Sequence, residues 1–289
     1  MIHKDNSEES LDKESLDKES LDEESLDKES LDEERLDEER LDEEIPTEIV
    51  LSGGHFATVA FLGKIHKLIK ENSLIISSIK RWICTSGGSI VALFLILGYS
   101  PLEIKDTFKE IAFHKLSPIN ASMWLEFFDK LGLHDTKNIA LIIESFIEHK
   151  GFDKNLTFLD LKELYDVELI FMTFCVNSSE LIEMSYLNYP HATIIEGIQM
   201  AIAAPLIFKP FSFQNRLYID AVISSNCPAT KCQSNNAYIF RIKKNKEYYD
   251  TINIFNHLKI IFTAMIERIE NLEICNTSSH KVFDIYTNF

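Results

Sequence analysis

The sequence lacks a long hydrophobic run. Its longest apolar stretch, Ile90 to Leu97, is far shorter than the roughly 20 residues that a helix needs to cross a bilayer. The first residues are acidic and contain no apolar core, which argues against a signal peptide. We therefore expect a cytoplasmic protein that is soluble, or at most peripheral to membranes.

Clustered cysteines are also missing. The five cysteines are far apart, and none forms a CxxC pair or a Cys/His group with the spacing of zinc ligands. The sequence therefore predicts reduced thiols and no metal site. The five are Cys84, Cys175, Cys227, Cys232 and Cys275.

Positive charge is scarce, and the negative charge is unevenly distributed. The net charge is -17, but residues 1–45 alone hold 21 acidic and 6 basic side chains, a balance of -15. The rest of the chain is therefore nearly neutral. Neither part has the basic surface that neutralises phosphates, so we expect no nucleic-acid partner.

The acidic segment is a repeat. Residues 10–44 are seven pentapeptides in which leucine recurs every five residues, from Leu11 to Leu41. A five-residue step spirals around a helix and alternates between the faces of a strand, so neither geometry buries these leucines. We predict a disordered low-complexity tail over residues 1–45, with no identifiable partner, and a folded domain over residues 46–289.

The folded part alternates short apolar strands with longer helices. Such alternation favours an α/β domain with a mainly parallel sheet covered on both faces. The predicted strands are 49–51, 82–84, 169–176, 217–219 and 237–242, and the main predicted helices are 59–69, 90–97, 139–149, 194–203 and 252–272. We expect the apolar positions of the last helix, among them Ile261, Met265 and Ile269, to pack on the sheet.

The sharpest local signal surrounds Ser86. Cys84 and Thr85 end a predicted strand, and Gly87 and Gly88 open a helix. A serine at such a turn has an exposed hydroxyl, and the helix N-terminus behind it favours developing negative charge. The motif indicates a nucleophile elbow, although a glycine-rich turn without chemistry has the same pattern.

Two weaker signals flank this motif. Gly53 and Gly54 follow a strand about thirty residues earlier, where backbone N–H groups can stabilise an oxyanion. Asp220 stands at the end of a later strand. Taken singly, the first is more often a plain turn and the second a cap or turn residue.

Taken together and in this order, the motifs resemble the patatin-like phospholipase family. The resemblance spans about residues 48–240, and it implies a three-layer α/β/α fold around a mainly parallel sheet. It is carried by Leu51-Ser52-Gly53-Gly54, Thr85-Ser86-Gly87-Gly88-Ser89, Ala201-Ile202-Ala203-Ala204-Pro205 and Ile219-Asp220-Ala221.

The resemblance also implies the chemistry. Ser86 would attack a lipid ester, Asp220 would accept or orient its proton, and backbone N–H groups of Gly53, Gly54 and His55 would hold the oxyanion. Cys84, Thr85, Gly87 and Gly88 would shape the nucleophile elbow. The family's lipid acyl hydrolases work through an acyl-enzyme and need no metal or cofactor, and their substrates are lipid esters at a membrane or lipid surface.

The sequence departs from the family pattern at several positions. The third glycine of the opening loop is His55, the following basic residue is Ala57, and the next glycine is Thr58; Ala221 replaces the glycine after the aspartate. These changes leave open a degenerate relative that binds lipid or protein without turnover.

A second alternative is a Ser-Asp-His triad of the α/β-hydrolase type. It would need a histidine after Asp220, and the downstream candidates are His257 and His280.

Overall fold

The computed structural model describes residues 45–110, 131–245, 254–275 and 280–287. The chain from Ile45 onward belongs to one compact unit. The acidic repeat, residues 10–44, lies outside the described residues, so its predicted disorder stays a prediction.

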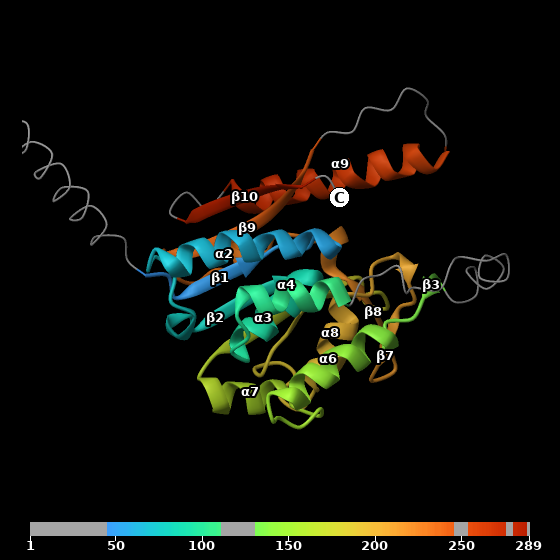
Figure 1. Ribbon diagram of the computed structural model, residues 1–289. Helices are drawn as coiled ribbons and strands as arrows, with labels where there is room; N and C mark the ends of the chain where they lie inside the picture. Colours follow the sequence, from blue (N-terminus) through green and yellow to red (C-terminus); the bar gives the residue numbers. More distant parts are fainter. Residues whose placement is uncertain (1–44, 111–130, 246–253, 276–279, 288–289) are drawn as a thin grey trace, which may run out of the picture. The chain divides into compact units, whose positions relative to one another are not determined.

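An eight-stranded sheet lies at the centre of this unit (Figure 1). Its order is β10-β9-β1-β2-β4-β8-β7, with β5 also paired to β4. The strands from β10 to β4 are parallel neighbours, whereas β5, β7 and β8 join in antiparallel pairs. The mainly parallel sheet predicted from the sequence is thereby confirmed. The strands are β1 (Glu48–Leu51), β2 (Arg81–Thr85), β4 (Glu168–Cys175), β5 (Glu180–Met184), β7 (Phe211–Phe213), β8 (Arg216–Asp220), β9 (Ala237–Lys244) and β10 (Lys281–Thr287), and a separate two-stranded sheet pairs β3 (Gly132–His134) with β6 (Leu206–Phe208).

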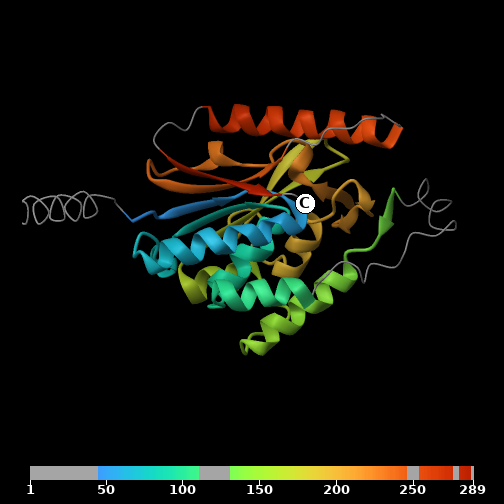
Figure 2. The ribbon, with the colours of Figure 1, turned by 45° about the horizontal axis from the view of Figure 1, so that its top comes forward.

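The helices cover the two faces of the sheet unequally. Figures 1 and 2 place α9 on one face and the helices from α2 to α7 on the other. The apolar contacts of α8 place it with the larger group. The helices are α2 (Phe61–Lys70), α3 (Gly87–Ile96), α4 (Pro101–Glu110), α6 (Lys137–His149), α7 (Phe158–Tyr165), α8 (Ile194–Ala201) and α9 (Ile254–Ile274), with short 3₁₀ turns η1 (His55–Ala60), η2 (Ile76–Ser78), η4 (Ala221–Ile223) and η5 (Ala229–Lys231).

Strand periodicity divides the core between these two faces. Successive strand side chains point to opposite faces, so Ile49 and Leu51 of β1 join the larger cluster while Val50 between them joins the smaller one. In β2, Trp82 enters the larger cluster and Ile83 the smaller one. Every residue of β2 is buried, which explains why its central residues 82–84 form an apolar run and do not alternate with polar ones.

The prediction for the last helix was only partly correct. A helix forms there, but Ile261 and Met265 are 43% and 57% exposed, so the expectation that they pack on the sheet was wrong. Ile269 is half-buried. The helix contacts η4 and η5, and the described contacts come from its C-terminal half, where Glu270 is buried and Ile274 packs against the smaller cluster.

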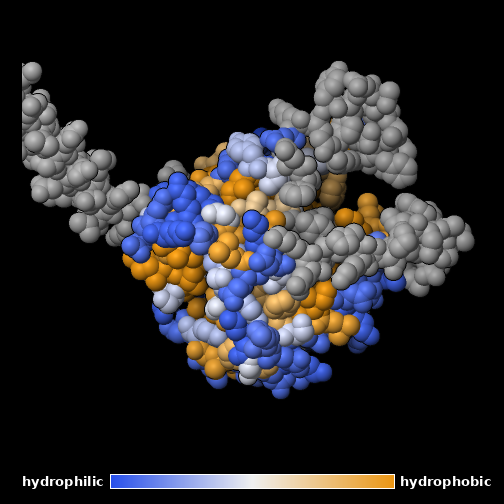
Figure 3. Space-filling model, in the orientation of Figure 1, coloured by the Kyte–Doolittle hydropathy of each residue, from blue (hydrophilic) through white to orange (hydrophobic). Residues whose placement is uncertain are grey.

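Other large apolar side chains also reach solvent in the described part of the chain, among them Leu102, Leu164 and Leu206. On the face shown in Figure 3, hydrophobic areas alternate with hydrophilic ones. Hydropathy therefore does not mark this face as a lipid-binding surface. Among the described helices, none combines the length and the apolar character needed to span a membrane.

Candidate active site

Ser86 occupies the sharp turn between β2 and α3. Its backbone angles are φ 54° and ψ -131°. The residue is only 3% exposed, so the exposed hydroxyl expected from the sequence is not found in this structure. A non-glycine residue in such a sparsely populated region costs about 1–3 kcal/mol and persists only where its surroundings enforce it. Directly before it, the Thr85 hydroxyl donates to the Ser225 carbonyl at 3.0 Å. The structure thus has the strand-turn-helix geometry expected of a nucleophile elbow.

Close packing explains the small residue behind the elbow. A Cβ on Gly88 would lie 2.7 Å from the Leu51 carbonyl oxygen and 2.9 Å from that of Ser52. Glycine at position 88 therefore lets α3 approach the end of β1. Cys84 is an ordinary buried strand residue, and burial raises the pKa of its thiol.

The pairing of β4 explains why Asp220 lies beside this turn. Thr85 pairs with Met172, and Asp220 pairs with the next residue, Thr173. Met172 and Thr173 both also pair with β5, so β2 and β8 must share the opposite edge of β4. The ends of β2 and β8 therefore meet on that edge, although their sequences are more than 130 residues apart.

Further contacts hold Asp220 in place. Its N–H donates to the carbonyl of Ala203, just after α8, at 3.0 Å. The Thr173 hydroxyl donates to the carbonyl of Ile219 at 2.8 Å. Ala203 belongs to the small-residue segment noted in the sequence, and its complete burial shows how closely that segment approaches the strand.

The Asp220 carboxyl is fully buried, and burial raises its pKa from 3.8 to about 7. The nearby Ser86 hydroxyl and the Val222 N–H, which donates to Oδ1 at 3.0 Å, act in the opposite direction. No hydrogen bond of ordinary geometry from a described residue reaches Asp220 Oδ2. A carboxyl with this pKa can both accept and return a proton near neutral pH.

The glycine loop lies against Ser86. A Cβ on Gly53 would lie 3.2 Å from Ser86 Cβ. The Gly53 N–H, however, already donates to the Asn226 carbonyl at 2.9 Å, so in this structure it is not available to an oxyanion. Among the described residues, no acceptor is bonded to the Gly54 N–H.

Two departures from the family pattern cause no backbone strain: Ala57, which stands in place of a basic residue, and Thr58, which stands in place of a glycine. Ala57 and Thr58 lie in η1, are buried, and have no left-handed backbone angles. The Ala57 N–H donates to the Gly54 carbonyl at 3.0 Å. The departures from the family pattern at these positions are therefore compatible with a well-formed loop.

Neither candidate histidine reaches the site. His257 is exposed on α9. His280 accepts from the Ala237 N–H at 3.3 Å, at the start of β9, whereas Ser86 follows the end of the parallel strand β2. The contacts recorded for Asp220 among the described side chains include Ser86 but no histidine.

Sequence reasoning missed two glutamates of α9 that contact the segment after Asp220. Glu270 and Glu273 of α9 bond Asn226, Ser225 and Cys227, which follow Asp220. The available signal was two acidic residues three positions apart, and therefore on one face of an amphipathic helix.

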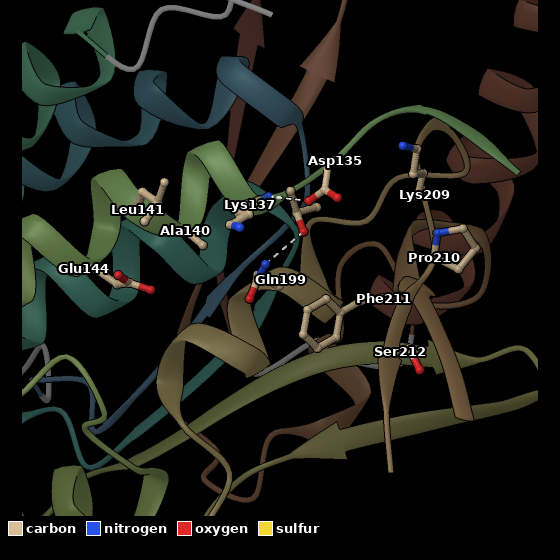
Figure 4. Close-up of a pocket in the computed structure, with 11 residues that line it drawn as sticks. Asp135, Lys137, Ala140, Leu141, Glu144, Gln199, Lys209, Pro210, Phe211 and Ser212 are labelled. Carbon is tan, nitrogen blue, oxygen red and sulfur yellow. Dashed lines mark hydrogen bonds between the residues drawn. The ribbon is translucent and has the colours of Figure 1, made fainter. Parts of the chain in front are cut away.

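A separate pocket of about 500 Å³ lies beside the start of α6 and the turn before β7 (Figure 4). Ser86 and Asp220 are not among its lining residues, so the pocket is separate from these two residues. Most of the side chains that line it are polar. Within the described ranges, no group of His, Cys, Asp and Glu could hold a metal ion. The pocket is lined by Asp135, Thr136, Lys137, Ala140, Leu141, Glu144, Gln199, Lys209, Pro210, Phe211 and Ser212.

The chain is similar to viral and bacterial proteins. Probable lipid hydrolase 463L of Invertebrate iridescent virus 6 is 29% identical over 213 residues, which cover 71% of this chain and 67% of that protein. Uncharacterized protein R571 of Acanthamoeba polyphaga mimivirus is 31% identical over 183 residues, or 63% of this chain and 60% of that protein.

A solved structure and a family model extend this comparison. The crystal structure of VipD from Legionella pneumophila has a TM-score of 0.54 at 16% identity, covering 85% of this chain and 63% of that chain, and it shows a shared fold. The model of the patatin-like phospholipase family matches residues 49–232, which is more than half of the sequence and includes Ser86 and Asp220. The chain therefore belongs to the patatin-like phospholipase family.

Proposed function

We propose that this protein is a lipid acyl hydrolase that cleaves carboxylic esters with a Ser86-Asp220 dyad. The observation that carries the proposal is the meeting of β2 and β8 on one edge of β4, which brings a buried carboxyl beside a strained serine. Family membership and the name of the iridescent virus relative support a lipid ester as the substrate.

The proposed reaction has two halves. Asp220 accepts the Ser86 proton as Oγ attacks the ester carbonyl, and it returns that proton to the departing alcohol, which leaves an acyl-enzyme. Water then attacks the acyl carbonyl and gives a proton to Asp220. Asp220 passes this proton to Ser86 Oγ as the bond from Oγ to the acyl carbon breaks and the fatty acid leaves. Asp220 thus ends each half of the reaction in its ionised form.

The oxyanion requires donors near Ser86. The N–H groups of Gly54 and His55 and the N-terminus of α3 supply them in this proposal. Gly53 has a different part, since its N–H is bonded to Asn226 and its small size lets the loop approach Ser86.

The occupied Gly53 N–H favours a second candidate function. If the loop holds too few free donors, the protein is a lipid-binding relative without turnover. Loss of one donor lowers the rate by about 10²–10³, so the two candidates differ by a measurable amount.

The test uses the full chain with three substitutions. Wild type should react with a serine-directed fluorophosphonate and release fatty acid from mixed phospholipid vesicles. Ser86→Ala should do neither, and Asp220→Asn should lose turnover. Ser89→Ala is the matched control, because the buried Ser89 hydroxyl has no hydrogen-bond partner among the described residues.

A folded wild type that neither reacts nor releases fatty acid would exclude the hydrolase. Binding of the same vesicles by that inactive protein would then support the lipid-binding alternative.

A further inference from the structure

The segment after Asp220 is anchored from the opposite side by α9. Glu270 Oε1 accepts a hydrogen bond from the Asn226 side-chain amide. Glu273 accepts from the Ser225 hydroxyl and, at 3.0 Å, from the Cys227 N–H. Two carboxylates one helical turn apart therefore hold three consecutive residues.

The same segment holds the active-site loops. The Asn226 carbonyl accepts the Gly53 N–H at 2.9 Å, and the Ser225 carbonyl accepts the Thr85 hydroxyl at 3.0 Å. Contacts therefore run without interruption from α9 to the glycine loop and to the residue before Ser86.

The side chain of Asn226 also approaches the glycine loop. A Cβ on Gly53 would lie 2.2 Å from Asn226 Oδ1, so this oxygen is directed at the glycine loop. That oxygen has no hydrogen-bond partner in the described part of the chain, and the other end of the amide is bonded to Glu270. Because Glu270 accepts the hydrogen bond of the amide nitrogen, it orients the Asn226 side chain so that the amide oxygen faces Gly53.

We propose that Glu270 and Glu273 are positioning residues, which set the glycine loop beside Ser86 by fixing Ser225, Asn226 and Cys227. The inference deepens the proposed hydrolase function and rests on it for its catalytic consequence. Both glutamates lie outside the residues that the family model matches, so they add to the dyad and are not part of the family pattern.

The charges around the pair support this role. Burial raises the pKa of Glu270, and it raises that of Glu273 to about 7. Arg241 and Lys243 of β9 and Lys231 of η5 act in the opposite direction. Arg241 is itself bonded to Asp284 through two 2.7 Å contacts. Buried carboxylates are costly unless they are hydrogen-bonded, and the bonds to residues 225–227 offset this cost for the buried Glu270 and the half-buried Glu273.

Amide hydrogen exchange tests the coupling without needing catalysis. In a Ser86→Ala background, Glu270→Leu and Glu273→Leu should raise the exchange rate of the segment 51–57 by about tenfold, as expected for one lost buried hydrogen bond. Glu270→Gln and Glu273→Gln keep an acceptor and should stay within about threefold of the parent. Glu267→Leu is the matched control, since Glu267 lies one turn earlier on α9 and acts on Glu270 through its charge, which raises the pKa of Glu270. Among the described contacts, Glu267 has no hydrogen bond to residues 225–227.

Kinetics on a soluble ester test the consequence with Ser86 in place. The two leucine variants should lose about 10- to 100-fold in kcat with KM changed less than about threefold, and the glutamine variants should recover most of the loss. This division between kcat and KM, with rescue by glutamine, separates positioning from a general loss of stability.

Unchanged exchange in segment 51–57 of the folded leucine variants would overturn the proposal. Faster exchange with unchanged kcat would also overturn it. If a leucine variant does not fold, Asn226→Ala removes the bridging amide itself and takes its place. A wild type without turnover would reject the hydrolase function, while the exchange experiment would still decide the coupling.

Discussion

At the scale of the residue, Asp220 should set the pH dependence of the proposed reaction. Its ionised form is the proposed base, and burial raises its pKa to about 7. We expect kcat/KM to rise with pH up to about 7 and then to level off, because protonated Asp220 cannot accept the Ser86 proton. An acid limb near pH 4 in a pH-rate profile would show that the carboxyl is not held in this buried state.

The same carboxyl should lower stability as the pH rises. Between pH 4 and 7 the folded state holds a proton on Asp220 that the unfolded state has lost, so the free energy of unfolding falls across this window. Asp220→Asn removes this contribution, and its thermal midpoint should exceed that of wild type above pH 7. Parallel midpoints for the two proteins from pH 4 to 8 would contradict the raised pKa.

Gly88 gives a steric test of the elbow. Gly88→Ala places a methyl group within 3 Å of Leu51 and Ser52, and we expect a loss of about 1–3 kcal/mol in the free energy of unfolding together with lower kcat. Gly63→Ala is the control, because its Cβ meets nothing within 4 Å on an exposed helical position and should stabilise by up to about 1 kcal/mol. Equal effects of the two substitutions in denaturant unfolding would argue against the close approach of α3 and β1.

At the scale of the element, α9 has an anchored half and an exposed half. Met265→Ala should change the free energy of unfolding by less than about 0.5 kcal/mol, because Met265 is mostly exposed. Ile274→Ala should cost about 1 kcal/mol or more, since Ile274 packs against the smaller cluster. Chemical denaturation of both variants measures the difference, and a larger loss for Met265→Ala would show that the middle of the helix is packed more tightly than its C-terminal end.

At the scale of the whole molecule, the acidic repeat is the main source of charge. An acidic segment is repelled by anionic membranes within about 10 Å at 0.1 M salt. Deleting residues 1–45, which carry a net charge of -15, should therefore strengthen binding to anionic vesicles and leave binding to zwitterionic ones unchanged. Vesicle co-sedimentation measures both. Equal binding to anionic vesicles with and without the repeat would contradict the predicted repulsion.

The sequence by itself determined the features that depend on neighbouring residues. Short apolar runs predicted β1, β2, β4, β8 and β9, and the order strand, Ser86, Gly87, Gly88, helix predicted the elbow, since both are encoded over a few residues. The resemblance to a family added Asp220 by analogy, without a reason for its position.

Only the tertiary structure decided the contacts between distant segments. The meeting of Ser86 with Asp220 depends on two strands sharing one edge of β4, and the occupied Gly53 N–H depends on Asn226. The burial of Glu270 and the exposure of Met265 depend on which residues of α9 contact the rest of the domain. Apolar periodicity shows which face of an element is apolar, but burial and hydrogen bonding are settled by what the rest of the chain brings against that face.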